Sequence, residues 1–237
     1  AEIFLPNIAT YDELKRVTEI LYRINKHALA LPCHHVETED IVHRNMRMGL
    51  GVTGYMQASD AQREWLPDLY EHIRQYDLQY SQKNGFPTSI NLTTVKPAGT
   101  LSLPPNVTPG VHPAIYAFYL RRIRINTSNP LVELCRQHGY TVEFQVGFDG
   151  TLDRNTSIVS FPCRYPSGTV LANSLSAIQQ LEYVKRLQTE WSDNAVSCTI
   201  YYKREELEEI KQWLRAHFST SVKGCSFLLH SEHGFQQ

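Results

Sequence analysis

Short runs of β-branched residues alternate with amphipathic helical segments along this 237-residue chain. A capping box at Thr10 and apolar residues at helical spacing predict a first helix to about Leu29. The same criteria predict further helices near residues 38–48, 67–85, 129–139, 176–191 and 204–217, and strands near residues 93–95, 116–125, 156–161, 195–202 and 222–229. Strands that alternate with helices indicate an α/β fold with largely parallel strands. We therefore expect residues 1–237 to form a single α/β domain or part of one.

The composition is that of a globular protein with almost no net charge. A formal net charge of -1 argues against a general binder of nucleic acid or of membrane surfaces. No apolar stretch approaches the roughly 20 residues that span a bilayer. Five scattered cysteines, an odd number, fit a reducing cytoplasm better than a disulfide framework. The chain starts at Ala1, inside an expected strand and without a leader peptide, which suggests a piece of a longer polypeptide.

A strand followed by a tight turn, at residues 93–102, is the strongest candidate for a binding site. The β-branched run at Thr93 ends at Pro97, which fixes its own φ and keeps Lys96 extended. The small residues that follow lead to Thr100, whose hydroxyl suits the start of a short helix. Unpaired backbone N–H groups in such a turn, together with a helix dipole, favour an anion. An ordinary strand-to-helix turn is the alternative.

Two groups of reactive side chains are weaker candidates. Cys33, His34 and His35, with His43, match no standard zinc spacing, so we expect surface or helix-end histidines and no metal site. Cys198 lies in an expected strand, where a buried structural thiol is favoured over a redox thiol.

Polar residues at other expected strands are open to more than one role. Arg122 and Arg124 share one face of their strand and Arg121 lies on the other. The sequence allows solvent, buried carboxylates or ligand phosphates as the partners of these three arginines. Asn194 opens the late strand, where a backbone partner is favoured over a ligand.

Several strings of residues occur in an order that is found in one enzyme family. Residues 93–102 read Thr-Thr-Val-Lys-Pro-Ala-Gly-Thr-Leu-Ser, and Gly-Val-His-Pro and Tyr-Leu-Arg-Arg-Ile-Arg-Ile follow at residues 110–113 and 119–125. Further strings agree at residues 45–54, 191–200 and 234–237. Along essentially its whole length the chain resembles the ribonucleotide reductases. It is most similar to the adenosylcobalamin-dependent (class II) group, especially the monomeric ribonucleoside-triphosphate reductases.

The resemblance implies a ten-stranded α/β barrel built from two half-barrels, of which this chain would form the C-terminal half. It also implies the reaction of that family, in which ribonucleotides are reduced at the ribose 2′-carbon by thiyl-radical chemistry with adenosylcobalamin. The loop that holds the substrate phosphates corresponds to Pro97, Ala98, Gly99 and Thr100. Ala98 stands where the family commonly has Ser. His112 would lie near the active-site mouth.

The residues that carry the radical chemistry of the family are absent from this sequence. The radical cysteine belongs to an Asn-x-Cys-x-Glu motif that does not occur here, and the other redox cysteines are missing too. Ala1-Glu2-Ile3 could be the tail of that motif, with Glu2 as the catalytic carboxylate. The string from Glu2 to Pro6 better matches a family segment just downstream. We therefore expect no catalytic residue in this chain.

The partners implied by the resemblance are a ribonucleotide substrate, the N-terminal part of the reductase that carries the radical cysteine, and a thiol reductant such as thioredoxin. The resemblance favours triphosphate substrates. The isolated chain is expected to be inactive. The alternative is a non-catalytic nucleotide-binding or assembly module that retains the reductase fold.

Overall fold

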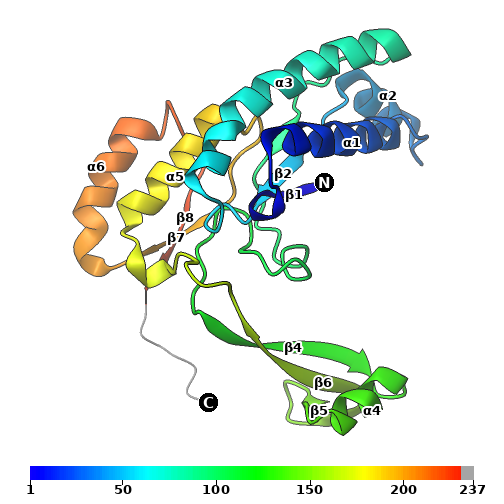
Figure 1. Cartoon of the computed structure of the whole chain (residues 1–237), viewed down its shortest axis with the longest axis vertical. Coiled ribbons are helices and arrows are strands. Elements are labelled where there is room, and N and C mark those ends of the chain that lie inside the picture. The colour runs from blue at the N-terminus through cyan, green and yellow to red at the C-terminus, as the bar shows by residue number, and fades with distance from the viewer. Residues whose placement is uncertain (231–237) are drawn as a thin grey trace. The chain divides into compact units, whose positions relative to one another are not determined.

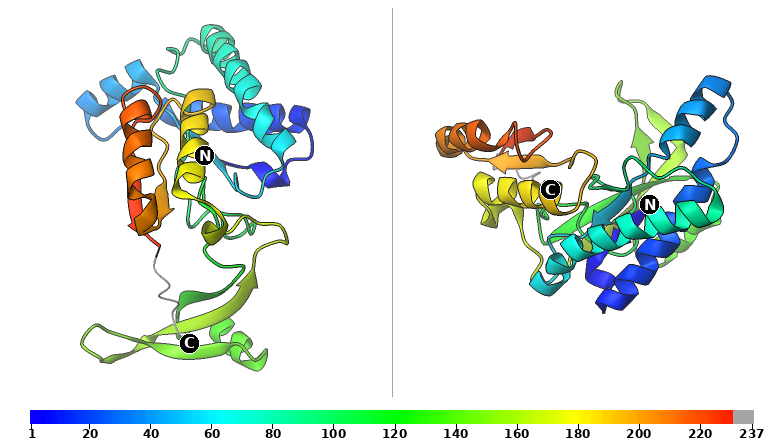
Figure 2. Two further views of the ribbon diagram at one scale, coloured as in Figure 1. Left: turned by 90° about the vertical axis from the view of Figure 1, so that its left-hand side faces the viewer. Right: turned by 90° about the horizontal axis from the view of Figure 1, so that it is seen from above.

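Residues 1–230 are described by the computed structural model of the chain, shown in Figures 1 and 2. Their contacts divide the chain into two compact units. Unit 1 contains residues 1–115 and the chain from residue 168 onwards, and unit 2 contains residues 116–167. The assignment of residues 1–237 to one domain stays a prediction, and the family-like string at residues 234–237 lies outside the described residues.

Parallel strands form the centre of unit 1. β1 (Glu2–Phe4), β2 (Leu50–Thr53) and β3 (Thr93–Thr94) pair in the order β1-β2-β3, and β7 (Thr199–Tyr202) pairs with β8 (Ser226–Leu229). An isolated parallel bridge between Val95 and Val196 links the end of β3 to the segment that leads into β7. The predicted α/β class with parallel strands is confirmed for this unit. The ten-stranded barrel stays a prediction.

Helices connect the parallel strands and pack their apolar side chains into the core. They are α1 (Tyr11–Leu29), α2 (Val36–Asn45), α3 (Asp60–Asn84), α5 (Ala177–Glu190) and α6 (Leu207–His217), with short 3-10 helices η1 (Leu5–Asn7), η2 (Ala172–Ser174) and η3 (Arg204–Glu206). Leu14 of α1, Leu69 of α3 and Leu181 of α5 are buried in one core with the sheet residues Ile3 and Val52. Figure 1 shows α1 and α3 side by side. No helix within residues 1–230 is long and apolar enough to cross a lipid bilayer.

The ends of the first two helices follow from local backbone chemistry. α1 begins after Thr10, whose side chain accepts the N–H of Glu13, as predicted. α2 ends at Asn45, before the predicted end near residue 48. Met46 has a φ of 44°, in the left-handed region, and cannot continue the helix.

α3 begins at Asp60, well before the start predicted at Pro67, so that prediction was wrong. Ser59 and Gln62 form a capping box at its start, because each side chain accepts the backbone N–H of the other residue. Pro67 lies inside the helix, where it has no N–H to donate to the preceding turn. The Ser-x-x-Gln pattern was the signal for the true start. The predicted end at Gly85, which has a φ of 71°, is confirmed.

Unit 2 is an antiparallel sheet with a helix. β4 (Phe118–Asn126), β5 (Thr141–Val146) and β6 (Leu152–Arg164) pair in the order β4-β6-β5, and α4 (Pro130–Gln137) connects β4 to β5. The largely parallel sheet predicted for the whole chain is therefore wrong for this unit. The loop from β5 to β6 is too short for a parallel crossover. β5 was not predicted, and β6 is longer than the strand predicted at residues 156–161.

The arginines of β4 lie on two faces, as predicted. Arg122 and Arg124 are exposed, and Arg122 pairs with Glu143 of β5. Arg121 lies on the opposite face and is half-buried, and its Nη1 has no hydrogen-bond partner among the described residues. A surface carboxylate is therefore the partner of Arg122.

Candidate functional site

The sheet β1-β2-β3 has one face packed on the helices and one face with small and polar residues. Leu50 and Val95 belong to the apolar core. Because side chains alternate along a strand, Glu2 and Gly51 lie on the opposite face. Lys96, which follows Val95, reaches Glu2 on that face. Glu2 and Gly51 are register partners on neighbouring strands. The parallel sheet thus brings together residues that are far apart in the sequence.

Glu2 is a buried carboxylate with few partners. Its side chain is 2% exposed, and its Oε1 lies 2.7 Å from Nζ of Lys96. Apart from this ion pair, neither carboxylate oxygen accepts a hydrogen bond within residues 1–230. A Cβ at Gly51 would lie 2.3 Å from Oε1, so the carboxylate fits against β2 because that residue is glycine. Buried polar groups are normally hydrogen-bonded, and Glu2 therefore retains acceptor capacity for a ligand.

The chain turns sharply after β3. Ala98 has a φ of 46°, and its carbonyl accepts the N–H of Ser102 at 3.0 Å. Turns follow as far as Asn106, so the short helix predicted to start at Thr100 is wrong. The physical reason is that Pro104 has no N–H with which to continue a helix from Thr100.

Four consecutive amides of this turn are unpaired. The N–H groups of Ala98, Gly99, Thr100 and Leu101 donate to no acceptor in the described part of the chain. Gly99 and Thr100 are also exposed. Successive N–H groups in a turn with a left-handed residue form a concave site for an anion. Because no helix starts here, an anion at this turn would be held by these amides and the Thr100 hydroxyl and not by a helix dipole.

Gly110 packs against the backbone of Lys96, at the start of the turn. It has a φ of 56°, and a Cβ there would lie 2.2 Å from the carbonyl oxygen of Lys96. Its N–H donates to Oγ1 of Thr53 at 2.6 Å, and its carbonyl accepts the N–H of Tyr55 at 3.1 Å. The two chain segments can approach this closely because residue 110 is glycine.

His112 is bonded to the backbone at both ring nitrogens. Nδ1 lies 3.0 Å from the carbonyl oxygen of Pro109, and Nε2 accepts the N–H of Thr199 at 3.1 Å. These partners require the ring proton on Nδ1. Burial lowers the pKa of His112. His112 thus ties the loop after the turn to β7, and its place near an active-site mouth stays a prediction.

Asp193, which the sequence did not single out, organises the start of β3. Its carboxylate accepts the N–H of Leu92 at 2.7 Å and the hydroxyl of Tyr70 at 2.8 Å, and pairs with Arg74 at 2.7 Å. Burial alone would raise the pKa of Asp193, but these hydrogen bonds and the Arg74 charge hold it below its usual value. Its place in the family-like string at residues 191–200 was the available signal.

Asn194 and Cys198 have the structural roles predicted for them. The Asn194 side-chain amide donates to the backbone carbonyls of Met48 at 3.2 Å and Thr93 at 2.7 Å. Cys198 is buried, and burial together with the neighbouring Cys225 raises the pKa of its thiol to about 12. A thiol with so high a pKa is a poor nucleophile.

The histidines near Cys33 are on the surface. His34 and His35 are exposed, and Nε2 of His43 lies 3.3 Å from the carbonyl oxygen of Leu31. Within residues 1–230, no three His, Cys, Asp or Glu side chains are grouped so that they could hold a metal ion.

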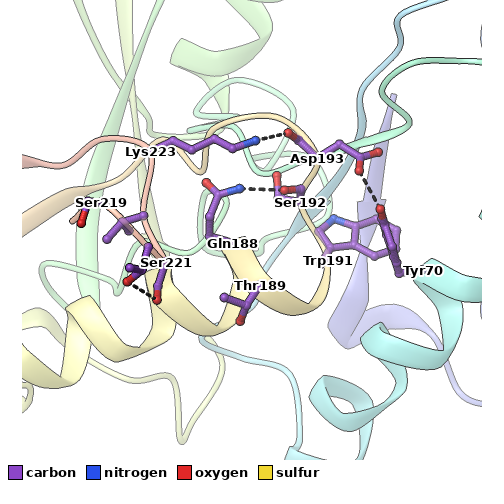
Figure 3. Close-up of a pocket in the computed structure, with 11 residues that line it drawn as sticks. Tyr70, Gln188, Thr189, Trp191, Ser192, Asp193, Ser219, Ser221 and Lys223 are labelled. Carbon is purple, nitrogen blue, oxygen red and sulfur yellow. Dashed lines mark hydrogen bonds between the residues drawn. The ribbon is translucent and has the colours of Figure 1, made fainter. Parts of the chain in front are cut away.

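A cavity of about 420 Å³ lies beside Asp193, and Figure 3 shows the residues that line it. Because Asp193 accepts the N–H of Leu92, the cavity is near the start of β3. Lys223 donates to the carbonyl of Asp193, and the Gln188 side chain donates to the carbonyl of Ser192. Lys223 and Gln188 thus hold the chain that precedes β7.

A second cavity, of about 580 Å³, adjoins the polar face of the sheet. Arg47, Gly49, Thr94 and Lys96 contribute to its wall. Its volume is in the range of small-ligand sites. The charge of Arg47 on the wall favours an anionic ligand, whereas the charge of Lys96 is paired with that of Glu2.

The comparisons with known proteins agree on one enzyme family, although no family model matches the chain. The chain is 34% identical over 234 residues to the adenosylcobalamin-dependent ribonucleoside-triphosphate reductase of Euglena gracilis, covering 96% of this chain and 31% of that protein. A probable adenosylcobalamin-dependent ribonucleoside-triphosphate reductase of Dictyostelium discoideum is 32% identical over 203 residues, covering 82% of this chain and 26% of that protein. This chain therefore spans about a third or less of these relatives.

Solved structures give the same result. A B12-dependent (class II) ribonucleotide reductase matches 100% of this chain and 37% of its own, with a TM-score of 0.83 and 26% identity. The alpha subunit of the class Id ribonucleotide reductase of Actinobacillus ureae, at 13% identity and a TM-score of 0.60, shares the fold alone. The resemblance drawn from the sequence motifs is confirmed.

Proposed function

The chain is a homologue of part of the adenosylcobalamin-dependent ribonucleoside-triphosphate reductases, and we propose that it supplies the substrate-phosphate turn of such an enzyme. The observation that carries this proposal is the row of unpaired amides from Ala98 to Leu101, next to the polar face of the sheet. The complete enzyme would convert ribonucleotides to deoxyribonucleotides by thiyl-radical chemistry, with the radical cysteine on the part absent from this chain.

Pro97, Ala98, Gly99 and Thr100 would form the turn around the substrate phosphates. Hydrogen bonds to a charged group contribute about 1.5–3 kcal/mol each, so a few amides and one hydroxyl suffice to anchor a phosphate. Because Ala98 has no hydroxyl, its contribution would come from the backbone. His112 would hold the following loop at the mouth of the site.

On the polar face of the sheet β1-β2-β3, the Glu2 carboxylate is the group that would exchange a proton with the substrate. Its burial, its unused acceptor sites and its place on the same sheet face as Lys96 support this role. We therefore favour Glu2 as the catalytic carboxylate, the alternative that the sequence alone ranked lower.

The complete enzyme would use adenosylcobalamin, as the names of the relatives state for those proteins. The cavities beside Asp193 and beside Lys96, of about 420 and 580 Å³, have the size of small-ligand sites. A corrinoid is considerably larger than such a ligand. Neither of these two cavities would enclose the cofactor by itself.

Reconstitution tests the proposal. The chain is combined with the remaining part of the reductase, adenosylcobalamin and a dithiol or thioredoxin, and deoxyribonucleotide formation is measured. We expect turnover from the combination and none from the chain alone. Turnover by the isolated chain would contradict the proposal. Nucleotide binding without turnover in any combination would support the alternative, a non-catalytic nucleotide-binding or assembly module.

A further inference from the structure

We infer that Lys96 is a positioning residue that sets the place of the Glu2 carboxylate relative to the phosphate turn. The inference rests on the proposed function, because it assigns both groups to one bound substrate. Lys96 is joined to the turn through its backbone and to Glu2 through its side chain. Lys96 thus connects the turn that would anchor the substrate phosphates to the Glu2 carboxylate that would exchange a proton with the substrate.

The backbone of Lys96 directs its side chain toward Glu2. Val95 lies in the apolar core, so Lys96 points to the opposite face of the sheet. Pro97 disfavours helical geometry at Lys96. Gly110 lies directly against the Lys96 carbonyl, which limits movement of the peptide that begins the turn.

The ion pair is unequal in exposure, which makes Lys96 important for Glu2. The Glu2 side chain is 2% exposed, whereas that of Lys96 is 44% exposed. Apart from Lys96, no group within residues 1–230 donates a hydrogen bond to the Glu2 carboxylate. An uncompensated buried carboxylate is costly. Without the ammonium group, the carboxylate is therefore expected to leave its place against Gly51.

Kinetics of the reconstituted enzyme test the inference. Lys96→Met removes the charge at nearly constant side-chain length, and Lys96→Arg restores it. We expect Lys96→Met to lower kcat about tenfold to a hundredfold, the cost of a misplaced reacting group, with little change in KM for the ribonucleoside triphosphate. Lys96→Arg should recover most of the lost kcat. Lys211→Met, which breaks an exposed ion pair with Glu208 on α6, is the matched control and should have no effect.

Three kinetic outcomes would overturn the inference. A raised KM with unchanged kcat would mean that Lys96 contacts the phosphates instead. Unchanged kinetics would reduce the ion pair to a structural feature. Equal losses in Lys96→Met and Lys96→Arg would show that charge is not what matters.

A stability cycle separates this inference from the proposed function. Urea midpoints are measured for the chain with Glu2→Gln, with Lys96→Met, and with both changes. If the reconstituted wild type shows no turnover, the proposed function fails, but the cycle still tests the ion pair. A smaller effect of Lys96→Met in the Glu2→Gln background supports the pairing. Additive effects would overturn it.

Discussion

The backbone N–H of Thr199 donates to Nε2 of His112 at 3.1 Å, and the same ring contacts the carbonyl oxygen of Pro109 through Nδ1. The imidazole therefore joins the loop that follows the turn at residues 97–106 to the first residue of β7. This link requires a neutral ring, because protonated Nε2 cannot accept a hydrogen bond.

His112 should make the stability of the chain depend on pH. Because burial lowers the pKa of His112 in the fold, the unfolded chain binds the proton more readily. The contribution of the neutral ring is complete above about pH 6.5, the ordinary histidine pKa. It is lost as the pH falls from there through the folded pKa. Urea unfolding at several pH values between 5 and 8 measures this change.

His112→Phe should remove that part of the pH dependence. It leaves the N–H of Thr199 without its acceptor, so we expect a loss of about 1–3 kcal/mol at neutral pH. An unchanged slope of stability against pH in the variant would exclude His112 as its source.

Lys26→Met should destabilise unit 1 strongly. Nζ of Lys26 is fully buried and lies 2.9 Å from Asp77 Oδ1, 2.6 Å from the Pro87 carbonyl and 3.0 Å from Ser89 Oγ. Removal of one member of a buried ion pair typically costs about 3–5 kcal/mol, because the other charge is left unpaired. Urea unfolding measures the loss.

Asp77→Asn in the Lys26→Met background provides the control for that experiment. It removes the unpaired charge but keeps an amide near Tyr22 and Ser89, which both donate to Asp77. We expect part of the lost stability to return. Further destabilisation by Asp77→Asn would contradict the explanation by an unpaired charge.

Gly51→Ala should displace Glu2. The added Cβ would lie within 2.3 to 2.6 Å of the three carboxylate atoms. Overpacking of this kind costs about 1–3 kcal/mol, and the reconstituted enzyme should also lose kcat. Gly224→Ala is the matched control, since a Cβ there has nothing within 4 Å among the described residues. Equal urea midpoints and equal turnover for both variants would show that the space at Gly51 does not hold the Glu2 carboxylate in place.

Thr100→Val should weaken nucleotide binding. The change keeps the shape of the side chain but removes the hydroxyl that would reach the phosphates. A hydrogen bond to a charged group is worth about 1.5–3 kcal/mol, which corresponds to at least about a tenfold rise in Kd. Calorimetric titration with a ribonucleoside triphosphate measures it. Thr220→Val, in an exposed turn after α6, is the control. An unchanged Kd would remove Thr100 from the site.

Local chemistry explains which elements could be predicted. The cap at Thr10, the end of α3 at Gly85 and the buried thiol of Cys198 follow from residues close in sequence or from strand burial. The errors also have local causes. Pro67 suits the first turn of a helix, but the capping box at Ser59 starts α3 earlier. Pro104 follows Thr100 too closely for a helix to continue.

The sequence by itself determined the α/β class, the short strand near residues 93–95, and the resemblance to the class II reductases. Only the tertiary structure decided that Glu2 lies beside Lys96 and that Asp193 holds the start of β3. Both contacts join strands or loops that are remote in the sequence. The register of parallel strands depends on the helices that bury the other face of the sheet. This packing joins residues that are remote in the sequence, so no local sequence pattern predicts it.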